Sequence, residues 1–254
     1  RDRYGNVSSA FEVPTTTELR PRGQIGGFDR QLDPERALGF ELGAKGILGG
    51  RLFFDLALFQ LHVDDALVPF EDNSGTFFQN AGEVRRRGIE LAASAELLPG
   101  LSFRSSYTYA HHEYLDFDKK TFTDTNGDGI DDLVTVASLD RRDEPNSPRH
   151  QAGCEVRYEH DSGFFSSVSV RHFSDVEVND ENDLESQGAT VSDARMGFSW
   201  GLDSLVVQPY LGVRNFSGAE YNGTVRVNDG FCRYFEPAPE VQYYGGLGIE
   251  LGLD

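Results

Sequence analysis

Residues 88–109 read GIELAASAELLPGLSFRSSYTY, and this stretch decides the fold class. On both sides of the Pro99-Gly100 pair, apolar side chains recur at every second position, with small or polar side chains between them. The apolar set is Ile89, Leu91, Ala93, Ala95, Leu97, Leu101, Phe103, Tyr107 and Tyr109. A period of two is typical of a strand with one apolar and one polar face, and a Pro-Gly pair favours a turn. The stretch therefore predicts two long antiparallel strands joined by a short turn.

The same alternation recurs along the chain and predicts an all-β fold of about twelve strands. They cover residues 4–12, 37–48, 52–67, 83–97, 101–116, 133–143, 150–160, 164–178, 190–200, 205–214, 221–228 and 241–253. The i, i+3, i+4 spacing of an amphipathic helix is not sustained anywhere, so we expect almost no helix. Strands of soluble sandwiches usually run about 5 to 6 residues, whereas strands that cross an outer membrane need about 9 to 11. The strand lengths favour an antiparallel transmembrane β-barrel.

Several predicted connections are short and several are long. The short ones are centred on Gly49, Pro99, Pro148 and Asn215, and the long ones cover residues 13–36, 68–82, 117–132 and 229–240. Outer-membrane barrels have short turns at the periplasmic rim and long loops outside. Counting strands along the chain predicts that all four short turns lie at one rim.

Composition excludes several other classes of protein. The 254 residues carry 42 Asp and Glu against 23 Lys and Arg, a net charge of −19, so nucleic acid is not an expected partner. No apolar run approaches the roughly 18 to 20 residues of a membrane helix. No nucleophile with a recognisable triad context is present, so we predict that the protein is not an enzyme. No cofactor is expected to be required.

Several phrases of the sequence, in this order, resemble one family. They are Ser9-Ala10-Phe11-Glu12-Val13-Pro14-Thr15-Thr16-Thr17-Glu18-Leu19, Pro34-Glu35 followed by Glu41-Leu42-Gly43, Asn80-Ala81-Gly82 with Arg87-Gly88-Ile89-Glu90-Leu91, Tyr107-Thr108-Tyr109, Ser147-Pro148-Arg149-His150, Val213-Arg214-Asn215-Phe216 before Glu220-Tyr221, and Arg233-Tyr234-Phe235-Glu236-Pro237-Ala238-Pro239. The set resembles the TonB-dependent outer-membrane receptors, in particular the C-terminal part of their 22-stranded barrel domain. The resemblance covers essentially residues 1–254, which we expect to form part of one barrel domain without the plug.

The resemblance implies a location, a function and three partners. The location is the outer membrane of a Gram-negative-type bacterium. The resemblance also implies that the C-terminus lies on the periplasmic side, which would put all four short turns at the periplasmic rim. The function is import of a metal chelate, with a ferric siderophore or other iron complex expected from what the family most often carries. The partners are outer-membrane lipid, the small-molecule chelate, and TonB acting through an N-terminal plug that this chain does not contain. Two alternatives stay open at this point, a passive porin-like channel and a secreted calcium-binding β-sandwich or adhesin module.

In this family, ligand contacts come from outer loops and from the inner wall of the barrel. The resemblance therefore implies that two groups of residues in this chain contact ligand. One group is Phe77 and Phe78, and the other is Phe231, Arg233, Tyr234 and Phe235. Packing within the loops, or an aromatic girdle at the membrane interface, is the alternative role for both groups. The last strand predicts the faces of the wall. Leu247, Ile249, Leu251 and Leu253 are expected to face lipid, and Gln242, Tyr244 and Glu250 the lumen.

An acidic loop is the sharpest local motif in the sequence. Asp124, Asn126, Asp128 and Asp132 hold the first, third, fifth and ninth positions of a calcium loop, and Ile130 would offer its backbone carbonyl at the seventh. The twelfth position is Thr135 in place of a bidentate Glu, so we predict weak calcium binding. A solvated acidic turn is the alternative.

Overall fold

The structure is a computed structural model that describes residues 1–21, 27–72, 75–123, 125–127, 133–202, 205–229 and 231–251. All regular elements in these ranges are β-strands, as the alternation predicts. Within the same ranges, no helix has the length and apolarity to cross a membrane.

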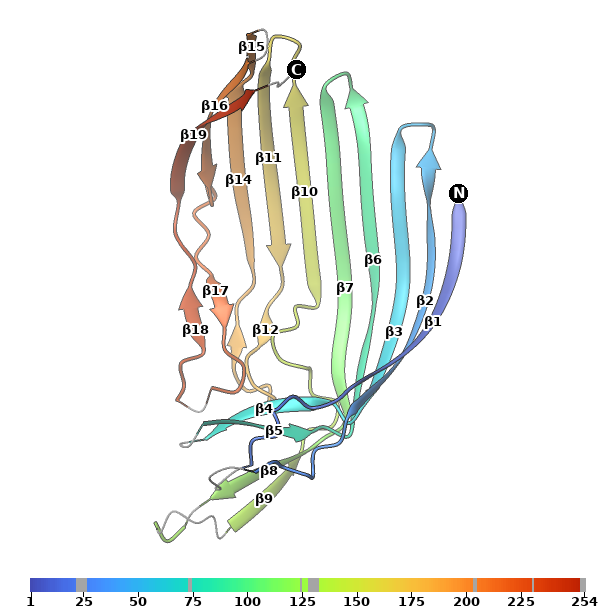
Figure 1. The fold of residues 1–254 in the computed structure, drawn as a ribbon, viewed down its shortest axis with the longest axis vertical. Helices are drawn as coiled ribbons and strands as arrows, with labels where there is room; N and C mark the ends of the chain where they lie inside the picture. The colour runs from blue at the N-terminus through green and yellow to red at the C-terminus, as the bar shows by residue number, and fades with distance from the viewer. Residues whose placement is uncertain are drawn as a thin grey trace.

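Eleven strands form one antiparallel sheet that curves into the wall seen in Figure 1. The order is β1-β2-β3-β6-β7-β10-β11-β14-β16-β15, with β19 also paired to β16. The strands are β1 (Asp2–Glu12), β2 (Glu35–Leu48), β3 (Leu52–Asp64), β6 (Glu83–Leu98), β7 (Leu101–Asp116), β10 (His150–Glu159), β11 (Phe164–Phe173), β14 (Ala189–Phe198), β15 (Trp200–Leu202), β16 (Leu205–Arg214) and β19 (Gln242–Leu251). Because β14 and β15 pair with the same strand β16 on either side of Ser199, they form one interrupted strand of the wall.

Four small hairpins lie at one end of the wall, which we call the mouth (Figure 1). They are β4 (Leu67–Asp72) with β5 (Gly75–Asn80), β8 (Asp118–Thr123) with β9 (Leu133–Ser138), β12 (Val176–Glu177) with β13 (Glu185–Ser186), and β17 (Asn222–Val225) with β18 (Phe235–Pro237). The opposite end, where short connections such as Gly49-Gly50 and Pro99-Gly100 join neighbouring strands, is the turn end.

Two predicted wall strands are wrong, and so are two predicted turns. Segment 133–143 contributes β9, which pairs with β8 outside the wall, and segment 221–228 contributes β17, which pairs with β18. Counting one strand too many inverts the predicted direction of the neighbouring wall strands. For this reason the Pro148 and Asn215 turns lie at the mouth. Because two strands are removed, the directions of the strands before residue 116 are unchanged, and Gly49 and Pro99 lie together at the turn end.

Strand register separates the two faces of the wall. Leu42, Leu58 and Ile89 are direct neighbours across β2, β3 and β6, and all three are exposed on the convex side. On β19, Leu247, Ile249 and Leu251 lie on the same side with 60%, 63% and 66% of their surface exposed. Gln242, Tyr244 and Glu250 lie on the concave side, as the alternation predicts, whereas Leu253 falls outside the described residues.

Aromatic rings on the concave side lie over glycines of neighbouring strands. A Cβ added to Gly212 would meet the ring of Tyr244 at 2.2 Å, and one added to Gly246 would meet the hydroxyl of Tyr210 at 2.4 Å. Tyr4 covers Gly43 in the same way. These glycines leave the space in which a neighbouring ring packs along the sheet, an arrangement that also pins strand register.

The buried core of the described residues lies at the mouth. It contains Val63, Ala66, Val68, Ala81, Val84, Tyr114, Phe117 and Leu139. Tyr114 and Phe117 pack with their ring centroids 4.8 Å apart, and both are almost completely buried. The core forms because the mouth hairpins cover the concave side at the ends of β3, β6 and β7, where the sheet alone would leave these side chains exposed.

Candidate functional site

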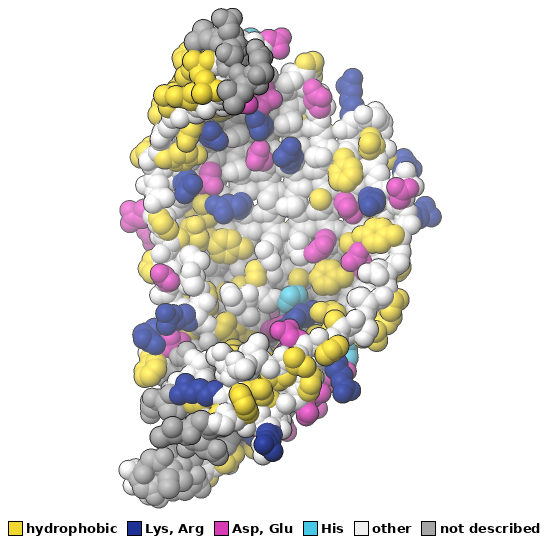
Figure 2. All heavy atoms as spheres, in the orientation of Figure 1, with side chains coloured by type: hydrophobic (Ala, Val, Ile, Leu, Met, Phe, Trp, Pro, Cys, Tyr) yellow, Lys and Arg dark blue, Asp and Glu magenta, His cyan; other side chains and the backbone are white. Residues whose placement is uncertain are grey.

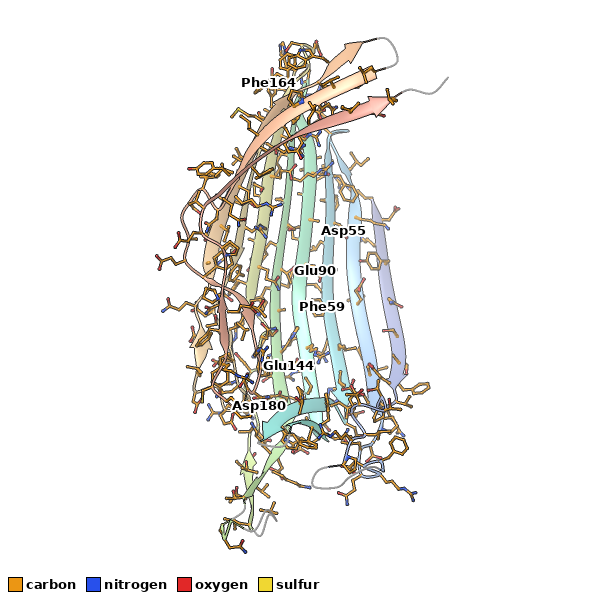
Figure 3. The ribbon with its side chains drawn as sticks, turned by 60° about the vertical axis from the view of Figure 1, so that its left-hand side comes forward. Asp55, Phe59, Glu90, Glu144, Phe164 and Asp180 are labelled. Carbon is orange, nitrogen blue, oxygen red and sulfur yellow. The ribbon has the colours of Figure 1, made fainter. Side chains whose placement is uncertain are left out.

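The concave side of the wall is polar and charged. Figure 2 looks into this hollow and shows acidic and basic side chains distributed over it. Asp55 and Glu90 are two of them, and Figure 3 labels both on neighbouring strands with Phe59 nearby. These polar residues alternate with apolar residues that point outward. The wall therefore has one polar face, on the concave side, and one apolar face.

The hairpin β4–β5 crosses the mouth and is fastened at several points (Figures 1 and 3). The side-chain amide of Asn80 donates to the carbonyl of Asp65 at 2.6 Å and to that of Asp33 at 3.0 Å. From the last loop, the amide of Asn228 donates to the carbonyl of Pro69 at 3.1 Å. Loops that are far apart in the sequence are therefore held together over the mouth.

A buried carboxylate connects these loops to the wall. Asp180 is fully buried and accepts hydrogen bonds from the Tyr114 hydroxyl at 2.9 Å and the Asn228 amide at 2.9 Å. Lys119 Nζ lies 3.3 Å from the same Asp180 oxygen, Oδ2, that accepts from Asn228. Burial raises the pKa of the Asp180 carboxyl, and the Lys119 charge opposes that rise. We call these four residues the mouth hub, since each comes from a different strand or loop.

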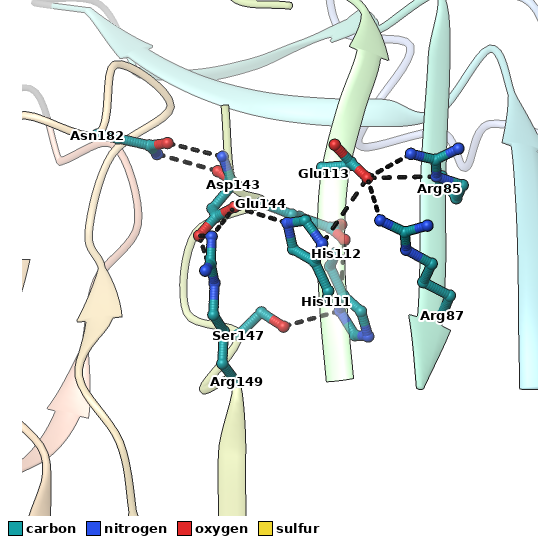
Figure 4. Close-up of polar contacts among 10 residues, drawn as sticks. All are labelled: Arg85, Arg87, His111, His112, Glu113, Asp143, Glu144, Ser147, Arg149 and Asn182. Atoms are coloured by element: carbon teal, nitrogen blue, oxygen red, sulfur yellow. Dashed lines mark hydrogen bonds and ion pairs between the residues drawn. The ribbon is translucent and has the colours of Figure 1, made fainter. Parts of the chain in front are cut away.

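Three ion pairs lie at the rim of the mouth, within and between the wall strands β6 and β7 and the segment before β10, and Figure 4 shows two of them. On the concave side, Arg86 forms a bidentate pair with Glu144 at 2.6 and 2.8 Å. On the convex side, Arg85 pairs with Glu113 at 2.6 Å, and Arg149 pairs with Asp143 at 2.6 Å. These pairs fix the rim of the mouth on both faces of the sheet.

The adjacent histidines of β7 point to opposite faces of the wall, as the strand period predicts. His111 lies 3.2 Å from Asp143, and His112 lies 2.7 Å from the Ser147 hydroxyl (Figure 4). The two imidazoles therefore cannot share one metal ion.

A pocket of about 230 Å³ opens between the first loop and the hairpins β4–β5 and β8–β9; we call it the mouth pocket. Its lining residues are Arg20, Asp29, Gln31, Leu32, Phe70, Phe77, Phe78, Gln79, Asn80, Asp118 and Lys120. The rings of Phe70 and Phe77 lie 5.9 Å apart, and the Arg20 guanidinium lies 5.1 Å from the Phe77 centroid. The mouth pocket thus combines aromatic surface with two cationic, two acidic and several amide side chains.

One polar atom of the mouth pocket has no partner in the described part of the chain. The Gln79 side-chain oxygen accepts a hydrogen bond from the Lys120 backbone N–H at 3.4 Å, but the buried Gln79 Nε2 donates to nothing there. An unsatisfied buried donor costs about 1 to 3 kcal/mol, so an acceptor on a bound molecule would be favoured at this point.

The two groups of predicted ligand residues lie in different surroundings. Phe77 is only 3% exposed and packs beneath Arg20, whereas Phe78 lines the mouth pocket at partial exposure. In the last loop, Phe231, Arg233 and Phe235 are exposed and Tyr234 is half-buried. None of these four is among the described residues that line the mouth pocket.

The sequence did not point to Arg20, Gln79 or Lys120. They come from three loops, and only the folded arrangement of the hairpins brings them together. Of the predicted calcium loop, Asp124, Asp128, Ile130 and Asp132 fall outside the described residues. Asn126 is described in an exposed bend, so calcium binding at this loop stays a prediction.

Comparison with known proteins identifies the family. The family model described as "TonB dependent receptor-like, beta-barrel" matches residues 4–216, which is most of the chain. The chain belongs to the TonB-dependent receptor family. The predicted family, and with it an all-β fold of the barrel type, is therefore confirmed, although the wall of this chain does not close on itself within the described residues.

Curated relatives of this TonB-dependent receptor chain are receptors and transporters. It is 32% identical over 111 residues to the metal-pseudopaline receptor CntO of Pseudomonas aeruginosa, covering 43% of this chain and 14% of that protein. It is 30% identical over 113 residues to the ferrichrome outer membrane transporter/phage receptor of Escherichia coli K12, covering 44% and 14%. The matched members of the family are transport receptors rather than enzymes.

Solved structures of the family share the fold over almost the whole chain. The siderophore receptor PiuA from Acinetobacter baumannii matches with a TM-score of 0.74 and 18% identity, over 98% of this chain and 33% of that one. The unliganded ferric citrate transporter FecA matches with a TM-score of 0.72 and 18% identity, over 98% and 35%. The chain thus spans about a third of the length of these receptors.

Proposed function

We propose that the chain forms part of the barrel wall and outer mouth of a receptor that imports a metal chelate, with a ferric siderophore or similar iron complex as its cargo. The receptor works in the outer membrane of a Gram-negative bacterium, where lipid meets its convex face. Energy comes from TonB through an N-terminal plug. The family match over residues 4–216 carries this proposal. The polar concave face and the apolar convex face support it, because transport through lipid needs this division.

The mouth pocket is the proposed point of ligand contact in this part of the receptor. Phe78 offers a ring face, Arg20 and Lys120 offer positive charge, and Gln79 Nε2 offers a hydrogen-bond donor. Siderophores hold their metal with anionic oxygen groups on an organic frame, and these groups match the donors and rings of the pocket. Phe231 and Arg233, exposed in the last loop with the guanidinium 4.9 Å from the ring, form a second proposed contact.

Uptake of radiolabelled iron chelates tests the proposal. The complete polypeptide that carries this chain is produced in a strain without its own siderophore receptors, and a panel of ferric hydroxamates, catecholates and carboxylates is offered. Saturable uptake that stops when TonB is deleted is the expected result. Uptake that persists without TonB, and rises in proportion to concentration, would establish the passive-channel alternative instead.

A pair of variants tests the mouth pocket within the same assay. Gln79→Ala removes the orphan donor and is expected to weaken chelate binding about tenfold, as loss of one charge-assisted hydrogen bond does. Ser162→Ala, in the turn at the opposite end of the wall, serves as the control and is expected to bind as the parent does. Equal affinity in both variants would place the chelate elsewhere in the mouth.

A further inference from the structure

Three potential metal ligands meet on the convex face of the wall, at the end of β3 and β6 nearest the mouth. His62 and Asp64 are two residues apart on β3 and therefore share a face, which is also the face of Leu58. Glu83 begins β6 and is the direct register partner of Asp64. The nearest ligand atoms of all three lie within 4.8 Å of one another.

The distances within this trio suit a metal ion better than a hydrogen bond. His62 Nε2 lies 3.5 Å from a carboxylate oxygen of Asp64 and 3.5 Å from one of Glu83. Hydrogen bonds between nitrogen and oxygen usually measure about 2.7 to 3.2 Å. Ligands bound tetrahedrally to zinc at about 2.0 to 2.2 Å are separated from each other by about 3.4 Å. The nitrogen is thus spaced from each carboxylate oxygen as a neighbour around one ion would be, and all three ligand atoms lie within 4.8 Å of one another.

The surrounding charges leave a place for a cation. Asp64 and Glu83 stand directly opposite each other, and like charges in that relation destabilise a pair of strands. Arg85, on the same face, is turned away and pairs with Glu113 at 2.6 Å. Arg36, the register partner of Asp64 on β2, is exposed and forms no ion pair with it in the described part of the chain. A divalent ion between the two carboxylates would remove their repulsion without moving the backbone.

We propose that His62, Asp64 and Glu83 form a binding site for a divalent transition metal, with Zn²⁺ as the ion their chemistry fits. One imidazole nitrogen and two carboxylate oxygens are common zinc ligands, and three protein ligands leave a coordination position for water or an external oxygen. The site lies on the convex face of the wall, outside the mouth pocket, so its ion is separate from the metal carried inside an imported chelate.

Zinc titration of the complete polypeptide in detergent tests the site. Zn²⁺ is titrated against a competing chromophoric chelator, and Co²⁺ is then added for its ligand-field spectrum. We expect one binding equivalent in the parent that His62→Ala, Asp64→Asn and Glu83→Gln each weaken at least about tenfold, since even the outer partners of metal ligands contribute that much. His150→Ala, another imidazole change on the convex face, is the control and should bind as the parent does.

Three results of the titration would overturn the zinc site. The first is the absence of a binding equivalent in the parent, and the second is equal Zn²⁺ affinity in the parent and His62→Ala. The third is an equal loss in His62→Ala and His150→Ala, because it indicates nonspecific binding to exposed imidazoles. Heat-modifiability on gels verifies that each variant is folded. Chelate uptake is expected to be unchanged in all four variants.

Discussion

The wall and the mouth of this chain are stabilised in different ways. The wall is a continuous ladder of antiparallel strands whose large apolar side chains, such as Leu42 and Ile249, are exposed on the convex side. The mouth is irregular, yet it contains the buried core around Tyr114 and Phe117 and the buried charge of Asp180. The stability of the wall depends on the hydrogen bonds between its strands and on the solvent that surrounds its exposed side chains. In the mouth, side-chain packing decides stability, as in a soluble protein.

This difference teaches that a barrel wall and its loops respond to different substitutions. A change in the core of the mouth should loosen the hairpins and leave the wall intact. A charge on the convex face should hinder insertion and leave the mouth packing unaffected. Variants of both kinds are made in the complete polypeptide and measured in a membrane or in detergent.

Phe117→Ala is expected to have the largest effect. It empties a fully buried site in the mouth core, which costs about 3 to 5 kcal/mol for a buried Phe. Hydrogen exchange should become faster in β4, β5 and β8 while β10 and β11 keep their protection. Phe235→Ala, which removes an exposed ring of the last loop, is the matched control with a small expected effect. Uniform loss of protection in wall and mouth would contradict the separation of the two regions.

Ile249→Arg is expected to be next. The residue is exposed on the convex face of β19, and an Arg facing lipid costs about 2 to 4 kcal/mol if it lies near the bilayer midplane and less toward either interface. Glu250→Gln, one residue along and on the concave face, should be nearly neutral. Reversible folding into lipid vesicles, followed by urea titration, measures both. Similar tolerance at the two positions would show that the faces are assigned wrongly.

Gly212→Ala sharpens the comparison within the wall. The added Cβ would meet the Tyr244 ring at 2.2 Å, so the ring must shift, at a cost of about 1 to 3 kcal/mol. The double variant Gly212→Ala/Tyr244→Ala should recover part of that loss, because the clash is removed with the ring. Urea titration of the two single variants and the double variant gives the coupling energy. Strict additivity would mean that ring and glycine are independent.

Asp180→Asn is expected to change how the stability of the mouth depends on pH. Burial raises the pKa of the Asp180 carboxyl above its ordinary value of 3.8. At pH values just above 3.8, the carboxyl is therefore protonated in the folded mouth and ionised in the opened mouth. The contribution of this group to mouth stability is therefore present at low pH and is lost as pH rises through that range. Hydrogen exchange of β8 in parent and variant over about pH 4 to 7 should show this loss in the parent alone.

Period-two alternation was sufficient to predict the wall. All ten segments that form it were found from the sequence, because the pattern of side chains at Ile89, Leu91 and their neighbours follows directly from strand geometry. The same pattern could not separate β9 from a wall strand. Its Leu133 and Val134 look like strand residues in the sequence, and only the choice of β8 as partner removes β9 from the wall.

The mouth could be predicted only in part, because its contacts join distant residues. Phe77 and Phe78 were found as aromatic loop residues, but the contact of Phe77 with Arg20 joins residues more than fifty positions apart. Asp180 gave no sequence signal at all, since its partners Tyr114 and Asn228 lie 66 and 48 positions away. Local propensity cannot report contacts of this separation, whereas a strand period repeats within a few residues.

The rings that lie over glycines also determine how wide the hollow is. Tyr244 and Tyr210 extend sideways along the sheet onto Gly212 and Gly246, so the length of each ring does not project toward the axis. The Arg195 guanidinium lies 4.1 Å from the Tyr210 centroid and that of Arg214 lies 5.3 Å from the Tyr244 centroid, so a solute moving along this part of the wall meets a cation stacked on each ring. With larger residues at those two glycines, the same tyrosines would be pushed inward and would narrow the free cross-section.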